Sequence, residues 1–312
     1  MHIPTHMIQG TVPQLTAAGS AAGLAAAAWF AVKSGDKPSS AKFASVTAFI
    51  FAAQMMNFPV QSGTSGHLIG ATLALMLLGI PHAVLSMSIV LAVQCFAFAD
   101  GGLDVLGANI LNMAILAIIP GALAKLYLLK SDSKNTSFRF FLIALSSWLS
   151  VVLASFACSI ELASSGTISA SAVIPAMTGV HALIGIGEAL ITAGAVFAIE
   201  TFSASAQKEA ETVSLKKKEY KITLASAVVI AMILSPFASS YPDGLEWVAM
   251  RLGFLHESMP LFVSPMSDYS VPFISNEMLS TSLAGITGTL IVFAAAYIIG
   301  IFMDKKLLRS GA

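Results

Sequence analysis

The sequence predicts an all-α integral membrane protein with about nine transmembrane helices, its N-terminus outside and its C-terminus inside. Of its 312 residues, 56% are hydrophobic and 10% are charged. A soluble domain carries about 25% charged residues, so this chain has too little polar surface to cover itself in water. Apolar stretches of roughly 20 residues, the length that crosses a bilayer, recur along the sequence. This composition excludes a disordered chain, a basic nucleic-acid binder and a disulfide-rich secreted scaffold.

Six stretches have the length and apolar character of a span. They are residues 17–32, 105–129, 140–160, 174–199, 222–237 and 283–303. Three further segments bring the count to nine. Residues 43–56 form an apolar segment that is short for a span. The other two segments are 68–80 and 83–99, which Pro81 separates because proline disfavours a continuous helix. The weakest of the nine is 68–80, which is compatible with a short or partly re-entrant helix.

The basic residues set the orientation. With nine spans the termini lie on opposite sides, and an outside N-terminus places fifteen of the sixteen Lys and Arg residues inside. Only Arg251 then falls outside, in agreement with the enrichment of Lys and Arg in cytoplasmic loops. The outside segments carry eight acidic residues. This excess either concentrates cations at that face or reflects nothing more than the lack of basic residues there.

Two modules are visible in the pattern of spans. Residues 1–202 hold seven spans, residues 203–220 form a polar linker on the inside, and residues 221–312 hold two spans around an outside segment. A short helix is expected in that outside segment over Gly244 to Leu252. Residues 1–15 lack the basic and apolar regions of a signal peptide. We therefore expect the mature chain to begin with Met1.

A free amino group followed by His2 is a compact metal chelator. The amine and the deprotonated amide nitrogen of His2 close a five-membered ring on a metal, and the amide and imidazole nitrogens close a six-membered ring. Three nitrogens then lie in one plane, and a fourth donor completes a square of the kind that suits Ni(II) or Cu(II). On its own this signal is weak, since a histidine at position two also occurs by chance.

His67 is the natural fourth donor. It lies in the Pro-, Ser- and Gly-rich stretch PVQSGTSGHLIG, residues 59–70, which joins two apolar runs. Irregular backbone at membrane depth is tolerated only where protein covers it or it lines a cavity. By the predicted topology this stretch is on the same side as Met1. The alternative is a loop histidine that caps the next helix.

Three other ionisable residues are candidates for a functional role. His181 and Glu188 are seven residues apart in an apolar run, so they share a helix face. Ionisable groups at that depth are costly and face the protein interior. They are candidates for an ion path or for support of the metal ligands, and the alternative is a polar pair that braces helix packing. His6 is a candidate supporting group near the N-terminus.

Several enzyme motifs are missing. The sequence has no HExxH, no GxxxxGK[ST] and no GxSxG. We therefore expect no catalytic residues, and any ATP hydrolysis must reside on a separate ATPase subunit.

The motifs MHIP at 1–4, AAQMMNFPVQSGTSGHLIG at 52–70 and HALIGIGEALITA at 181–193 together resemble the CbiM/NikM family. Its members are substrate-specific membrane components of energy-coupling-factor transporters for cobalt or nickel. Residues 235–249, SPFASSYPDGLEWVA, and the DYSVP at 268–272 resemble the PDGLE form of the family's small N component. The resemblance covers nearly the whole chain. Many members open with MHIPDGFL, whereas this chain reads MHIPTHMI.

The resemblance implies a multi-pass protein of the plasma or cell inner membrane whose residues 1–202 form a metal-binding M domain. The family holds its metal in a square of nitrogens from the amine of Met1, the amide and imidazole of His2, and the imidazole of His67. The implied cargo is Ni²⁺ or Co²⁺, with no resident cofactor. The implied partners are a transmembrane coupling protein (Q type) and an ATPase (O type).

The motifs of the family are shared by its nickel and cobalt members, so they do not separate the two metals. Fusion of M and N parts in one chain resembles the nickel branch of the family, and Ni(II) prefers square-planar coordination. A different class of function is a stand-alone secondary metal-ion permease. That alternative needs a relay of intramembrane ionisable groups, for which His181 and Glu188 are the candidates.

Overall fold

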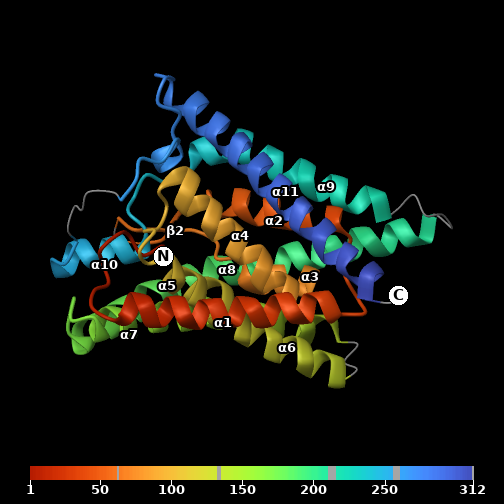
Figure 1. Ribbon diagram of the computed structural model, residues 1–312, viewed down its shortest axis with the longest axis horizontal. Helices are drawn as coiled ribbons and strands as arrows, with labels where there is room; N and C mark the ends of the chain where they lie inside the picture. Colours follow the sequence, from red (N-terminus) through yellow and green to blue (C-terminus); the bar gives the residue numbers. More distant parts are fainter. Residues whose placement is uncertain (62, 132–134, 210–215, 256–260, 311–312) are drawn as a thin grey trace.

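A computed structural model describes residues 1–61, 63–131, 135–209, 216–255 and 261–310, and Figure 1 shows it. The chain is helical, with one short pair of strands. The helices of residues 1–209 are α1 (Val12–Lys33), α2 (Ser40–Gln54), α3 (Ala71–Leu78), α4 (Ile80–Phe98), α5 (Leu106–Ile110), α6 (Ile118–Ser131), α7 (Thr136–Ser164) and α8 (Ala170–Glu209). The strands are β1 (Phe58–Pro59) and β2 (Ser65–Gly66).

The remaining helices belong to residues 216–310. They are α9 (Lys216–Val229), α10 (Gly244–Leu252) and α11 (Glu277–Ser310). A π-helical turn, η2 (Ile230–Leu234), and a 3-10 turn, η3 (Ser235–Phe237), extend α9, and a further 3-10 turn, η4 (Ser267–Tyr269), precedes α11. The expected linker at 203–220 lies partly outside the described residues, with α8 continuing to Glu209 on one side.

Seven helical segments are long and apolar enough to cross a membrane. They are residues 12–33, 80–98, 106–131, 136–164, 170–201, 220–237 and 277–303. These match seven of the nine expected spans. The other two correspond to α2, with 15 residues, and α3, with 8 residues. At 1.5 Å per residue α3 rises only about 12 Å, less than half of a hydrocarbon core of about 30 Å. Nine crossings therefore remain a prediction.

Glycines at positive φ set both ends of α3. Gly70 precedes it with a φ of 80° and Gly79 follows it with a φ of 81°. Residues with a Cβ pay for this conformation, so glycine is the residue that allows the chain to turn sharply here. Between α2 and α3 runs an irregular segment, residues 55–70, which we call the His67 loop. Its residues 64–70 are buried in the protein.

The third long span is interrupted by a π-helical turn, η1 (Leu111–Leu116). The amide of Ala117 donates to the carbonyl of Asn112, five residues earlier, at 3.0 Å. The break lies just before Pro120, which cannot donate to the carbonyl of Leu116, four residues earlier. The π-helical turn thus lies about one helical turn before Pro120.

The second module, residues 221–312, packs on the first. Helix α11 lies along α2, α9 also contacts α2, and α10 packs against α8. The N-terminus and α10 are at one end of the helices and the C-terminus is at the other (Figure 1). The expected helix over 244–252 is confirmed: Asp243 caps it in a capping box with Glu246, and Gly253 ends it at a φ of 75°.

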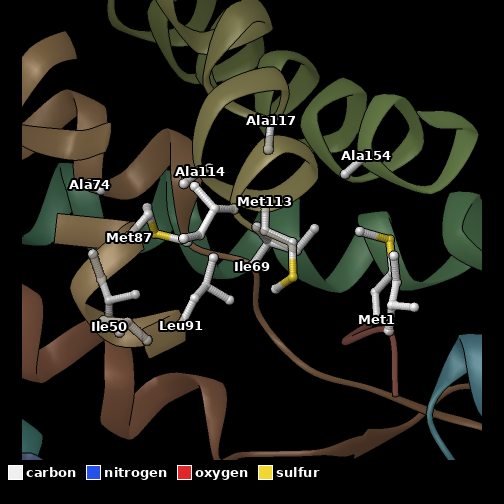
Figure 2. Close-up of a cluster of buried hydrophobic side chains, with 14 of the residues drawn as sticks. Met1, Ile50, Ile69, Ala74, Met87, Leu91, Met113, Ala114, Ala117 and Ala154 are labelled. Atoms are coloured by element: carbon white, nitrogen blue, oxygen red, sulfur yellow. The ribbon is translucent and has the colours of Figure 1, made fainter. Parts of the chain in front are cut away.

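The core lies where α2, α3, α4 and η1 meet. Fully buried side chains there include Phe43, Phe51, Leu75, Met87 and Met113. The side chain of Met1 joins the same buried cluster at 4% exposure, so the first residue of the chain is part of the interior (Figure 2).

A close helix contact leads to a test of this packing. A Cβ added to Gly107 on α5 would lie 2.5 Å from the Cα of Ala17 on α1. We expect Gly107→Ala to destabilise the protein by about 1–3 kcal/mol, because backbone must move apart. The control Gly194→Ala, with nothing within 4 Å of the new Cβ, should be neutral or stabilising. Thermal unfolding in detergent measures both, and equal midpoints would contradict the contact.

Candidate metal site

The first eight residues, which we call the N-terminal strap, lie against the membrane helices rather than in solvent. Ile3 is 1% exposed and Ile8 is 2% exposed. The amide of Ile3 donates to Asn109 Oδ1 at 2.8 Å, and its carbonyl accepts from the amide of Gly102 at 2.8 Å. A Cβ on Gly102 would come within 2.5 Å of the backbone of Thr5, so glycine is needed for this approach. Backbone contacts on both sides therefore fix the strap.

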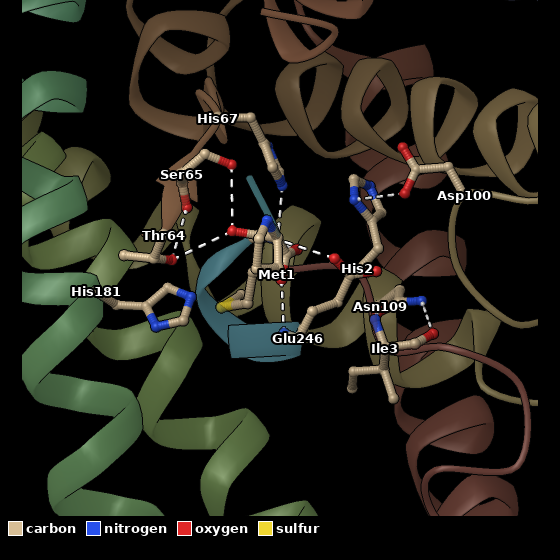
Figure 3. Close-up of polar contacts among 12 residues, drawn as sticks. Met1, His2, Ile3, Thr64, Ser65, His67, Asp100, Asn109, His181 and Glu246 are labelled. Atoms are coloured by element: carbon tan, nitrogen blue, oxygen red, sulfur yellow. Dashed lines mark hydrogen bonds and ion pairs between the residues drawn. The ribbon is translucent and has the colours of Figure 1, made fainter. Parts of the chain in front are cut away.

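The amino group of Met1 lies at the centre of the candidate site (Figure 3). Its nitrogen is 2.7 Å from Nε2 of His67, which is 66 residues away in the sequence. It also donates to Oδ2 of Asp243 at 2.6 Å, and in this ion pair Met1 is buried and Asp243 is partly buried. The structure thus brings Met1 and His67 together, as the sequence predicts, and adds a carboxylate from the second module.

The ring of His67 presents a lone pair to this amine. Its Nδ1 is 3.0 Å from the carbonyl oxygen of Leu68, which can only accept, so Nδ1 carries the hydrogen. Nε2 is then the free acceptor that faces Met1. A ring whose far nitrogen donates to a backbone carbonyl is the usual arrangement of a metal-binding histidine.

His2 lies beside His67, with the two rings stacked at a centroid distance of 5.1 Å and an interplanar angle of 21°. Its Nδ1 is 3.0 Å from Oδ1 of Asp100. Its Nε2 is 3.0 Å from Oε1 of Gln94, which is fully buried on α4. Both ring nitrogens of His2 are therefore engaged by partners from the end of α4.

Burial favours the neutral form of both imidazoles. Burial, with the nearby amino group of Met1 and the His2 ring, holds the pKa of His67 well below its ordinary value. Burial is also the main reason that the pKa of His2 is lowered, although Asp100 opposes it. Burial alone would raise the pKa of Asp243, but the amino group and His67 more than offset it, so the net pKa is lowered. Neutral imidazoles are the form that binds metals.

The distance between the Met1 amine and Nε2 of His67 is close to the edge of a square of nitrogen ligands. Metal–nitrogen bonds of about 2.0 Å place neighbouring corners of a square about 2.8 Å apart. The 2.7 Å between the Met1 amine and Nε2 of His67 is close to that edge. Among the described residues, no group of three or more His, Cys, Asp or Glu side chains is arranged to hold a metal. The chelate predicted from the sequence uses the amine and a backbone nitrogen of the strap instead.

His181 faces the same place from α8. It lines a cavity of about 10 Å³ together with Met1, His67, Asp243 and Gly244. This is room for about one water molecule. Nδ1 of His181 is 2.8 Å from the carbonyl of Met177, and its buried Nε2 has no hydrogen-bond partner. The structure thus places His181 at the edge of the candidate site.

Glu188, seven residues along α8, supports the His67 loop. Its two carboxylate oxygens accept from the amides of Ile69 and Gly70 at 2.5 and 2.8 Å. Glu188 is fully buried, and α3 begins directly after these two amides. It does not contact the amine or His67 directly, so its place is to hold the backbone that carries His67.

His6 lies away from the amine. Its side chain is 51% exposed, and its Nδ1 is 3.2 Å from Asp104. Its φ of 65° is left-handed, at the position where MHIPDGFL sequences carry glycine. His6 therefore fastens the strap to Asp104 and takes no part in the buried contacts.

Sequence reasoning missed four residues of the site: Gln94, Asp100, Asn109 and Asp243. None has a motif spacing that points to Met1 or His2. The PDGLE segment was visible as a motif, but its contact with the amine depends on how the second module packs.

Two family matches cover most of the chain. Residues 2–206 match the CbiM family, described as the cobalt uptake substrate-specific transmembrane region. Residues 217–305 match the PDGLE domain.

Among curated proteins, the "Putative fused nickel transport protein NikMN" of Archaeoglobus fulgidus is 35% identical over 264 residues, which is 82% of this chain and 84% of that protein. The "Fused nickel transport protein NikMN" of Rhodobacter capsulatus is 25% identical, over 80% of this chain and 82% of its own length. The "Cobalt transport protein CbiM" of Acetoanaerobium sticklandii is 30% identical over 47% of this chain and 61% of its own length.

Solved structures agree. A structure described as a transition metal transporter superposes with a TM-score of 0.58 at 29% identity, covering 71% of this chain and 99% of its own. A truncated transition metal transporter gives a TM-score of 0.57 at 31% identity, with 65% of this chain and 99% of its own covered. The chain carries a PDGLE domain after its CbiM region. The helices, the sequence matches and these structures agree that it is a multi-pass membrane protein of metal-ion transport that belongs to the CbiM family of substrate-specific transmembrane proteins.

Proposed function

We propose that this chain is the substrate-binding membrane component of an energy-coupling-factor transporter that imports a divalent transition-metal ion. The ion is held in a square by the amine of Met1, the amide and imidazole nitrogens of His2, and the imidazole of His67. The observation that carries the proposal is the 2.7 Å contact between the buried amine and Nε2 of His67.

His2 has to turn for the square to close. A six-membered ring from its amide nitrogen runs through Cα, Cβ and Cγ to Nδ1, so Nδ1 is the chelating ring nitrogen. In the structure Nδ1 faces Asp100. The ion therefore replaces Asp100 as the partner of Nδ1 when it binds.

Nickel is the favoured cargo over cobalt. Four nitrogens with a deprotonated amide among them form the strong planar field that suits Ni(II). Two curated relatives that cover about four fifths of this chain are named as nickel transport proteins. Relatives named for cobalt cover about half of it.

The assembly and topology follow from this proposal. Residues 1–202 form the metal-binding domain, 203–220 the linker on the inside, and 221–312 the PDGLE-type domain. Met1 and α10 face the outside, where the ion arrives, with nine spans between the termini. A transmembrane coupling protein and a separate ATPase supply the energy.

A stand-alone permease is the second candidate, because His181 and Glu188 are buried ionisable groups on one helix. The bonds of Glu188 to two backbone amides argue for a fixed supporting role instead. Uptake of Ni(II) by cells that express this chain without coupling protein or ATPase would favour the permease.

The first prediction concerns the chelating ligands. His2→Ala, His67→Ala and a chain extended by one residue before Met1 each remove one donor or displace the amine. We expect each to weaken Ni(II) binding by about a hundredfold or more, because a chelate loses both a bond and its geometry. Calorimetry on the purified full-length chain measures Ni(II) and Co(II) side by side. Wild-type affinity in the extended chain would contradict the proposal, and tighter Co(II) than Ni(II) binding would reverse the choice of cargo.

The second prediction concerns Glu188. A glutamine here offers one acceptor oxygen to two backbone donors and turns an NH₂ group toward the other, so Glu188→Gln should loosen the His67 loop. We expect Ni(II) affinity to fall by about tenfold or more. Glu200→Gln, on the same helix in an exposed pair with Arg139, is the matched control and should bind as wild type. Equal affinities in the two variants would remove Glu188 from the site.

A further inference from the structure

Asp243 belongs to the second module yet lies in the metal site of the first. Its carboxylate accepts from the amine of Met1 at 2.6 Å, across 242 residues of sequence. The side chains of Met1 and Asp243 are 3% and 14% exposed. The carboxylate of Asp243, in the PDGLE segment, therefore pairs directly with the amine of Met1.

The loop that carries Asp243 is fixed on several sides. The carbonyl of Pro242 accepts from the amide of Ser65, in the His67 loop, at 2.9 Å. Toward α8, a Cβ on Gly244 would lie 2.8 Å from Cε1 of His181, so glycine allows the close contact. Oδ1 of Asp243 accepts from the amide of Glu246 at 2.9 Å, which leaves Oδ2 for the amine. The carboxylate thus has little freedom to move.

The chemistry of a metal-bound amine lets Asp243 stay in place. A primary amine that gives its lone pair to a metal keeps two N–H bonds. One of these can continue to donate to Asp243 while the lone pair points toward the ion beside His67. A carboxylate that orients a ligand through its N–H group is a recognised device of metal sites, and its removal costs about 10–100-fold in affinity.

We propose that Asp243 is a positioning residue for the terminal amine, through which the second module sets the affinity of the metal site. The inference rests on the proposed function, since it requires that the amine bind the ion. The end of a chain is ordinarily poorly ordered, so an anchor on the amine reduces the ordering that the ion would otherwise have to impose. Through Asp243, residues of the PDGLE segment complete a site whose ligands all belong to the first 67 residues.

Two substitutions separate positioning from a merely structural role. Asp, Asn and Ser are nearly equivalent as helix N-caps, so Asp243→Asn and Asp243→Ser both preserve the cap of α10. Serine is too short to reach the amine. Asparagine has one oxygen for the two donors that Asp243 serves, so an asparagine that caps α10 turns its NH₂ group toward the amine. We expect Ni(II) affinity to fall by about 10–100-fold in both Asp243→Ser and Asp243→Asn. Asp268→Asn, an exposed carboxylate of the same outer segment, is the control and should match wild type.

The measurement is Ni(II) calorimetry on the full-length chain in detergent, with Cu(II) absorption at saturation as a second readout. The planar absorption band should persist in all three variants, because the four nitrogens remain. If Asp243→Ser and Asp243→Asn both bind as tightly as wild type, Asp243 is only a cap and the inference is overturned.

The extended chain and His67→Ala are measured beside them. Normal binding in those two would instead overturn the proposed function itself. If Asp243→Ser does not fold, the loss in Asp243→Asn relative to Asp268→Asn decides the question.

Discussion

A buried amino terminus is the constraint on which the rest of this site depends. An ammonium group taken out of water costs several kcal/mol unless a partner of opposite charge and further hydrogen bonds replace its hydration. The nitrogen of Met1 has such partners in Asp243 and His67, at 2.6 and 2.7 Å. Because these partners come from positions 67 and 243, the amine can be buried only if the His67 loop, α10 and the strap are all in place. The start of the chain therefore ties three distant segments together.

The same constraint accounts for the irregular backbone between α2 and α3. A regular helix through residues 55–70 would use its own amides and carbonyls for internal bonds and would bring no loop to the amine. In the observed loop the carbonyl of Leu68 orients the His67 ring, and the amides of Ile69 and Gly70 turn to Glu188. Helix α3 is short as a result, because the residues before it position Nε2 of His67 instead of forming helix.

The sequence predicted much of this arrangement, and its failures have definite causes. Met1 and His67 lie together, as the family resemblance implied and as the chelate chemistry of Met1-His2 allowed. At 68–80 the chain forms a short helix, which was one of the interpretations of that segment. Hydrophobicity does not register that Gly70 and Gly79, both at positive φ, confine this helix to eight residues. The expected helix at 244–252 was right because capping residues are local signals. Asp243 was missed because its partner is 242 residues away, and no local pattern encodes that contact.

The second module reaches the other chelating residue as well, although less directly. Tyr269, at a left-handed φ of 54°, stacks on Phe98 with 4.6 Å between ring centroids and donates to Oδ2 of Asp100 at 2.5 Å. The other oxygen of Asp100 faces Nδ1 of His2. Backbone in this region is costly for a residue with a side chain and persists where its surroundings hold it. Asp243 on Met1 and Tyr269 on the partner of His2 therefore form two attachments of the same outer segment to the same two-residue chelator. Fusion of the two modules in one chain thus places residues of both at the candidate metal site, with Asp243 on the amine and Tyr269 on the carboxylate that faces His2 in the structure.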